Sequence, residues 1–217
     1  MKRILFFLLT LMLSPAIALG YTATVPEQDI GLHPQGWVSP AGIKFEPGSQ
    51  MELNEHGEVI SGVLKFGEYM RSVGKCTTPL LGRPLVSNFI SFKGRITFDE
   101  QGRVFSGTLS GNNDVYLIPD VESSVIFKGG TTILFDKNDN VKVGTLGYDT
   151  FLRPAGWEKF LPANAIFIKF KAETEIVFGA NAQVLKGKIA NDLQINGTTY
   201  PAGTTLQFAE AAYPQKI

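Results

Sequence analysis

The stretch FKGGTTILFDKNDNVKVGTL, residues 127–146, is one of four copies of a single repeat in this chain. Each copy has a Phe, a short polar step, two apolar residues one apart, a turn, and then Val, Gly and a final Leu or Ile. The other copies begin at Phe45, Phe92 and Phe170, and a fifth copy breaks off after residues 200–208, YPAGTTLQF. Because each such unit buries its apolar face only against its neighbours, the repetition predicts a repeat architecture.

Within each copy the middle segment alternates apolar and polar residues, as in Ile133 and Phe135, which predicts a half-buried strand. A turn follows, and the returning strand carries Val141 and Leu146 five residues apart. In a regular strand these two would face opposite sides of a sheet. Gly144 and its counterparts always stand two residues before the final apolar residue, so we expect a β-bulge or corner at the glycine.

Two arrangements satisfy this pattern. The first is an all-β fold of repeated antiparallel β-hairpin units, stacked as an elongated or solenoid-like sheet. The second is a closed β-barrel or a sandwich made of the same strands. The connections between copies vary in length and the last copy is truncated, which favours the stack. We expect one domain over residues 19–217, with units starting near residues 45, 92, 127 and 170 and a partial cap from residue 200.

The first eighteen residues have the pattern of an export signal. Lys2 and Arg3 precede an uncharged apolar run over residues 4–13, and Ala16-Ile17-Ala18 supplies the small-x-small cleavage pattern. The run is shorter than the roughly twenty residues that a membrane-spanning helix needs, and no later stretch is long and apolar enough for one. We therefore predict an exported protein that is not membrane-spanning, in the periplasm, outside the cell or on its surface.

The charge balance limits the classes of partner, and the cysteine content limits the disulfides that the chain can form. The chain has 20 basic and 20 acidic side chains, and removal of Lys2 and Arg3 leaves 18 basic ones (20 minus 2). Both signs are scattered, so nothing here attracts nucleic acid or an anionic membrane surface. Cys76 is the only cysteine, which excludes an internal disulfide, and we expect it to be a buried or half-buried small hydrophobic residue.

The sequence shows no catalytic constellation. His33 and His56 are the only histidines, and the Gly-x-Ser-x-Gly, His-Glu-x-x-His and Cys-x-x-Cys patterns are all missing. Asp136, Asn138 and Asn140 alternate as in a calcium loop, but Val141 replaces the glycine that such a loop needs, so a hairpin turn explains them better. We predict no cofactor, no metal and no enzymatic activity.

A smaller motif precedes two of the units. Residues 32–37 (LHPQGW) and 152–157 (LRPAGW) match at several positions, and the dipeptides Arg83-Pro84 and Ile118-Pro119 look like eroded versions. Proline cannot donate to a β-ladder, so these segments are expected at strand ends or corners. The candidate contacts to a partner or glycan lie here: Trp37, His33, Trp157, Arg153 and Tyr148. The alternative is that each Trp covers the end of a β-layer, with the Arg or His stem packed over it.

The order of strand, turn, strand and Gly resembles MORN-type hairpin repeats, although the Tyr-x-Gly spacing of that family is missing. The chain also resembles exported bacterial proteins with repeats of Gly-Thr-Leu, Asp-Thr and Leu-Arg-Pro-x-Gly-Trp, here residues 144–146, 149–150 and 152–157. Neither resemblance implies an activity or functional residues.

The leading hypothesis is an exported, non-enzymatic β-repeat protein of the bacterial cell envelope, which binds or scaffolds an envelope protein or glycan. One alternative is a hydrolase of envelope or extracellular polymer, with carboxylates gathered from different repeats. Another is a small outer-membrane β-barrel, for which strands of about nine to eleven residues would be needed.

Overall fold

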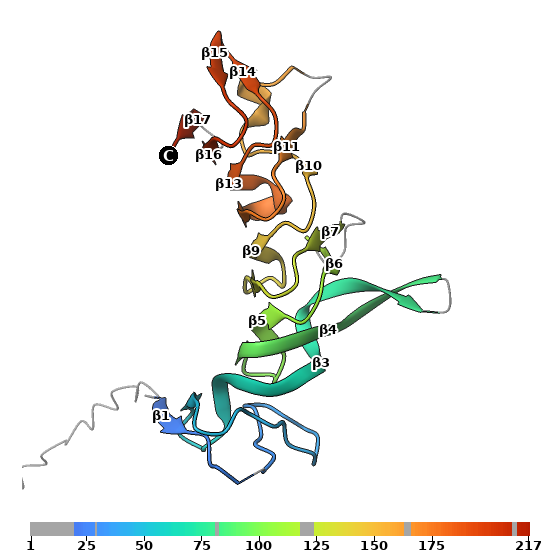
Figure 1. The fold of residues 1–217 in the computed structure, drawn as a ribbon, viewed down its shortest axis with the longest axis vertical. Coiled ribbons are helices and arrows are strands. Elements are labelled where there is room, and N and C mark those ends of the chain that lie inside the picture. Colours follow the sequence, from blue (N-terminus) through green and yellow to red (C-terminus); the bar gives the residue numbers. More distant parts are fainter. Residues whose placement is uncertain (1–19, 29, 81–82, 118–123, 163–165, 210–211) are drawn as a thin grey trace, which may run out of the picture.

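The computed structural model of the protein describes residues 20–28, 30–80, 83–117, 124–162, 166–209 and 212–217. The predicted signal segment therefore lies outside the described residues. The described chain is built of strands and turns, with two single-turn 3-10 helices, and it extends along one axis as a stack (Figure 1). The predicted all-β, elongated arrangement is confirmed.

One antiparallel sheet runs the length of the stack, and its strands follow one another almost in chain order. Its path is β1 (Tyr21–Thr24), β2 (Gln50–Leu53), β3 (Val59–Leu80), β4 (Arg83–Phe98), β5 (Val104–Leu109), β8 (Thr132–Phe135), β9 (Val141–Thr145), β12 (Glu175–Phe178), β13 (Val184–Lys188), β16 (Thr205–Ala209) and β17 (Ala212–Lys216). The path ends at β1 and β17 without their pairing, so the sheet is open and the closed alternative is wrong. Within the described residues no helix is long and apolar enough to cross a membrane.

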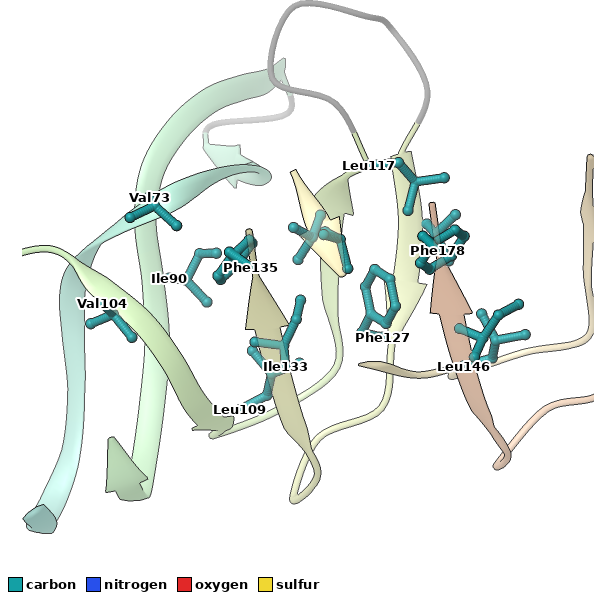
Figure 2. Packing of buried hydrophobic residues seen from close by; sticks show 14 of the residues in the cluster. Val73, Ile90, Val104, Leu109, Leu117, Phe127, Ile133, Phe135, Leu146 and Phe178 are labelled. Carbon is teal, nitrogen blue, oxygen red and sulfur yellow. The ribbon is translucent and has the colours of Figure 1, made fainter. Parts of the chain in front are cut away.

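Each unit is a hairpin of this sheet, and the Phe that begins the unit pairs with its last apolar residue. The bridges are Phe45 with Leu64, Phe92 with Leu109, Phe127 with Leu146, and Phe170 with Ile189. All eight side chains are buried. Figure 2 shows Phe127 in the core beside Phe178 of the next unit, whose ring centroid is 6.4 Å away in an edge-to-face arrangement. The four copies therefore share one backbone setting, as the repeat predicts.

The β-bulge exists, but it lies two residues before the predicted position. In the third unit Leu134 pairs with Val143 and Phe135 with Val141, so Lys142 is the extra residue. This bulge turns both Val141 and Leu146 toward the core. The same shift occurs in the other three units.

The glycine has a different role, which is to make room for the ring of its own unit. A Cβ placed on Gly144 would stand 2.4 Å from Cδ1 of Phe127, well inside van der Waals contact. At Gly62, Gly107 and Gly187 the corresponding distance to the Phe of the same unit is 2.7 Å. Any side chain at this position would therefore displace the ring from the core.

The connections between units form a second set of hairpins. They are β6 (Asn113–Tyr116) with β7 (Ser124–Phe127), β10 (Thr150–Leu152) with β11 (Ile168–Phe170), and β14 (Leu193–Ile195) with β15 (Thr198–Tyr200). Their inward residues, such as Val115, Leu152 and Ile195, belong to the same buried cluster as the repeat Phe rings. The core is therefore enclosed between the main sheet and these connections.

The connection between the first and second units is much longer than the others. It is formed by the outer parts of β3 and β4, which pair with each other as far as Leu80 and Arg83 and extend sideways from the stack (Figure 1). Cys76 lies on this hairpin and is buried, as expected. Where the hairpin crosses the third unit, Gly74 lies under the ring of Phe135.

Of the corners predicted from the sequence, two are present in the structure, and a third segment has another role. Pro34 and Pro154 make parallel bridges to Val59 and Val184, the residues that open the returning strands. In the second unit the equivalent bridge to Val104 is made by Ser72 instead. Arg83-Pro84 is wrong as a corner, because it pairs with Pro79 and Leu80 within the long hairpin. Ile118-Pro119 lies outside the described residues.

Replacement of Gly144 by Ala tests the packing of ring on glycine. The added methyl meets Phe127, so we expect Gly144→Ala to lower the free energy of unfolding by about 1–3 kcal/mol, as overpacked cores do. Gly111→Ala is the matched control, because a Cβ there meets nothing within 4 Å. Urea denaturation of both variants gives the comparison. Equal stability of the two variants would contradict the explanation, and Phe127→Leu in the Gly144→Ala background should recover part of the loss.

Candidate functional site

Trp37 is held in place by a tight contact between the first corner and the next unit. The side chain of Gln35 donates from Nε2 to the carbonyl of Phe98 at 3.1 Å. Gly36 has φ 65°, and a Cβ there would stand 2.3 Å from the carbonyl oxygen of Glu100, so only glycine fits. Trp37 itself donates from Nε1 to the carbonyl of Ala41 at 2.8 Å. The half-buried indole is therefore fixed at its edge.

A cleft opens beside this indole, between the corner and the base of the β3–β4 hairpin. Its volume is about 290 Å³, and an adjoining lobe of about 280 Å³ shares several of its residues. We call the pair the Trp37 cleft. Its main lining side chains are Trp37, Tyr69, Met70, Arg71, Phe89 and Gln101, with Ser39 at the rim. The adjoining lobe adds Lys44 and Glu68.

Two aromatic side chains of the cleft are exposed. Tyr69 is 71% exposed and Phe89 51% exposed, comparable with other aromatic residues of the connections such as Phe151, whereas the Phe that begins each unit is buried. Arg71 lies directly opposite Phe89 in the ladder. Among the described residues, no carboxylate pairs with the Arg71 guanidinium, unlike that of Arg103 described below. The cleft therefore offers flat apolar faces, hydroxyl and amide groups, and one available cation.

The five candidate residues from the sequence fall into two separate places. Trp37 lies in the cleft. His33 is exposed and stands outside the residues that line the cleft; its carbonyl accepts the Val59 N–H at 2.9 Å. Trp157, Arg153 and Tyr148 belong to the connection before the fourth unit.

In that fourth-unit connection the charged groups are already engaged. The Arg153 guanidinium lies 5.8 Å from the ring centroid of Phe167, and Lys169 lies 5.9 Å from that of Phe151. Lys169 is also 3.6 Å from Asp149. A hydrogen bond from the Ala172 backbone N–H, together with Lys169, holds the pKa of Asp149 below its usual range. Arg153 thus pairs with Phe167, while half-buried Trp157 packs against the core.

Tyr69, Arg71 and Phe89 were missed by the sequence reasoning. They lie in the long connection, which has no sister copy to align with, and so no repeat position marked them. The only available signal was the density of aromatic and basic residues flanking the alternating stretches at residues 65–71 and 86–93.

Two acids from different units do come together elsewhere, around Arg103. Its Nε lies 2.8 Å from Asp99 and one terminal nitrogen lies 3.0 Å from Asp139. Burial alone would lower the pKa of Arg103, but the hydrogen bonds and charges of the two acids outweigh it and raise that pKa. A cavity of about 340 Å³ adjoins the group.

The contacts of this acid pair indicate a structural role. Together with Arg103 the two acids form an ion-pair network between the second and third units, which we call the structural tie. The other oxygen of Asp99 accepts backbone N–H groups of Gln101 and Arg103 at 3.0 and 2.8 Å. Asp136 caps its own turn in the same way, accepting from Asn138 and Asn140, as a hairpin turn requires. The guanidinium of Arg103 stands between the two carboxylates, where a bond to be hydrolysed would have to lie. The described residues also hold no group of three metal-ligating side chains.

Arg103→Met tests the structural tie. The change leaves two partly buried carboxylates without their shared donor, so we expect the free energy of unfolding to fall by about 1–2 kcal/mol. Lys137→Met is the control, because Lys137 is exposed on the adjacent turn. Chemical denaturation at low and high salt should show a loss for Arg103→Met alone. A loss of the same size in both variants would point to general charge effects and against the tie.

Comparison with family models, with curated proteins and with solved structures finds no match for this chain. Its function is therefore inferred from its own residues and their geometry.

Proposed function

We propose that this chain is an exported, non-enzymatic binding protein of the bacterial cell envelope, which holds its ligand in the Trp37 cleft of an elongated β-repeat scaffold. The observation that carries the proposal is the cleft itself. It places three aromatic rings and an available guanidinium around one hollow. The predicted export signal supports the location.

The lining of the cleft suits binding better than catalysis. Of the described residues around its larger lobe, none is a His, Cys, Asp or Glu, so the lobe lacks the side chains that most often act as general acid, general base or thiol nucleophile. Exposed aromatic side chains beside a pocket are typical of recognition surfaces, because they contribute large contact areas at a small entropic cost. Repeat scaffolds present such sites on extended surfaces.

A hydrolase is the second candidate, since Asp99 and Asp139 are carboxylates gathered from different units, as that hypothesis requires. Glycoside hydrolysis needs one acid free to donate a proton and one to act on the sugar or water. Both carboxylates here bind the same guanidinium. The binding role is therefore the better supported of the two.

The two tryptophans provide a direct test, because they are the only indoles in the chain. In Trp157→Phe the fluorescence reports on Trp37 alone, and in Trp37→Phe on Trp157 alone. Titration with soluble peptidoglycan fragments and with envelope polysaccharide should change the emission of Trp157→Phe in a saturable way. The emission of Trp37→Phe should stay constant. A response confined to Trp157, or no saturable response in either variant, would contradict the proposed site.

A further inference from the structure

We infer that the Trp37 cleft selects an acidic sugar, a pyranose whose carboxylate binds Arg71 while its ring lies against the aromatic side chains. The inference rests on the proposed function and specifies its ligand class. It combines the shape of the cleft with the positive charge of Arg71, which lines the larger lobe.

The aromatic side chains favour a ring-shaped ligand with apolar faces. Trp37 is fixed by its hydrogen bond to Ala41, and Tyr69 and Phe89 project from paired strands. Aromatic side chains have few rotatable bonds, and Trp37 is also held by its hydrogen bond, so these rings lose little freedom on binding. A pyranose presents C–H groups on its faces, and these carry the slight positive charge that the face of an aromatic ring attracts. The two lobes together have the volume of a small-molecule site.

The charge of the larger lobe favours an anion. Arg71 lines this lobe, which has no acidic residue among its described lining, whereas Glu68 lies in the adjoining lobe with Lys44. Other cations near acids in this protein are used internally: Lys128 pairs with Glu173 at 2.7 Å, for example. A guanidinium presents two parallel N–H groups to a carboxylate, which gives direction as well as attraction. A carboxylate in this lobe therefore meets a complementary charge.

The rim supplies groups for sugar hydroxyls. Ser39 accepts the Ala41 N–H through Oγ at 3.3 Å and keeps its own hydroxyl proton for a ligand. Gln101, on the turn of the second unit, also lines the cleft and is exposed, so its amide is available to a ligand. An acidic peptide would also satisfy Arg71, but it has no need of several ring faces and dispersed hydroxyl partners around one hollow.

The test uses two ligands that differ at one carbon, methyl β-D-glucuronide and methyl β-D-glucoside. Binding to the Trp157→Phe protein is followed through Trp37 fluorescence. We expect the glucuronide to bind about tenfold more tightly, as one charge-assisted hydrogen-bonded pair allows. Arg71→Met should reduce glucuronide affinity to about that of the glucoside, so that the difference between the two ligands disappears. Arg71→Lys should recover part of the difference, and Arg153→Met should change neither affinity.

The outcomes separate this inference from the proposed function. If the two sugars bind with equal affinity and Arg71→Met has no effect, the acidic-sugar inference is overturned. The proposed function, binding of a ligand in the Trp37 cleft, is then retained. A third outcome is that neither sugar binds, whereas a short Asp- and Glu-rich peptide binds saturably and this binding is lost in Arg71→Met. That result would overturn the acidic-sugar inference and assign the site to acidic peptides. Failure of Trp37 to respond to sugars, peptide and envelope polymers alike would overturn the proposed function as well. Matching thermal unfolding of the variants confirms that each is folded.

Discussion

The packing of a Phe ring on a bare glycine backbone is the constraint on which the rest of this structure depends. In each unit the ring occupies the volume that a side chain on the returning strand would fill, as Phe127 does over Gly144. The same glycine pairs with Ile176 of the next unit, so the contact fixes both the thickness of one unit and its register with the following one. A ring so placed also reaches the next unit: Phe127 meets Phe178, and Phe170 meets Phe208 at 5.9 Å. The stack is therefore held by contacts that each unit makes with itself and its successor.

The edge strands of the sheet, β17 and β1, lie at the two ends of the stack, where a unit is packed on one side only. The fifth copy keeps the buried Leu206 and Phe208, and β17 takes the place of a returning strand although its sequence has lost the repeat pattern. Pro214 lies in this edge strand and has no N–H to offer a further chain, which is a common way to protect an open edge from unwanted pairing. At the other end, β1 is short and largely exposed.

The sequence was informative where structure is local and repeated, and uninformative where it depends on distant contacts. Alternation and turn residues predicted the hairpins, because four copies report the same environment. The sequence analysis placed the bulge at Gly144, whereas it lies at Lys142. A bulge at either position brings Val141 and Leu146 to one face. Only the contact of the Phe127 ring with Gly144, which needs the structure, shows that the glycine has another role. The long β3–β4 hairpin had no copy for comparison. Of the candidate site, Trp37 was found from its corner motif, but its neighbours come from that hairpin, and no local pattern shows which residues two separate segments will bring together.

This division between repeat positions and connections explains where the Trp37 cleft lies. The repeat positions are committed to packing, and replacing them disturbs two units at once, whereas the connections vary in length without affecting the register of the stack. Trp37 and Trp157 stand at equivalent positions in two copies of the corner motif, so the motif alone does not form the Trp37 cleft. What differs is the connection that follows the unit: the long β3–β4 hairpin after the first unit, and the three-residue strands β14 and β15 after the fourth. The longer hairpin places Tyr69, Arg71 and Phe89 within reach of the first corner. The cleft therefore follows from one lengthened connection beside an otherwise repeated corner, and Tyr69, Arg71 and Phe89 line it from outside the repeat positions that pack the stack.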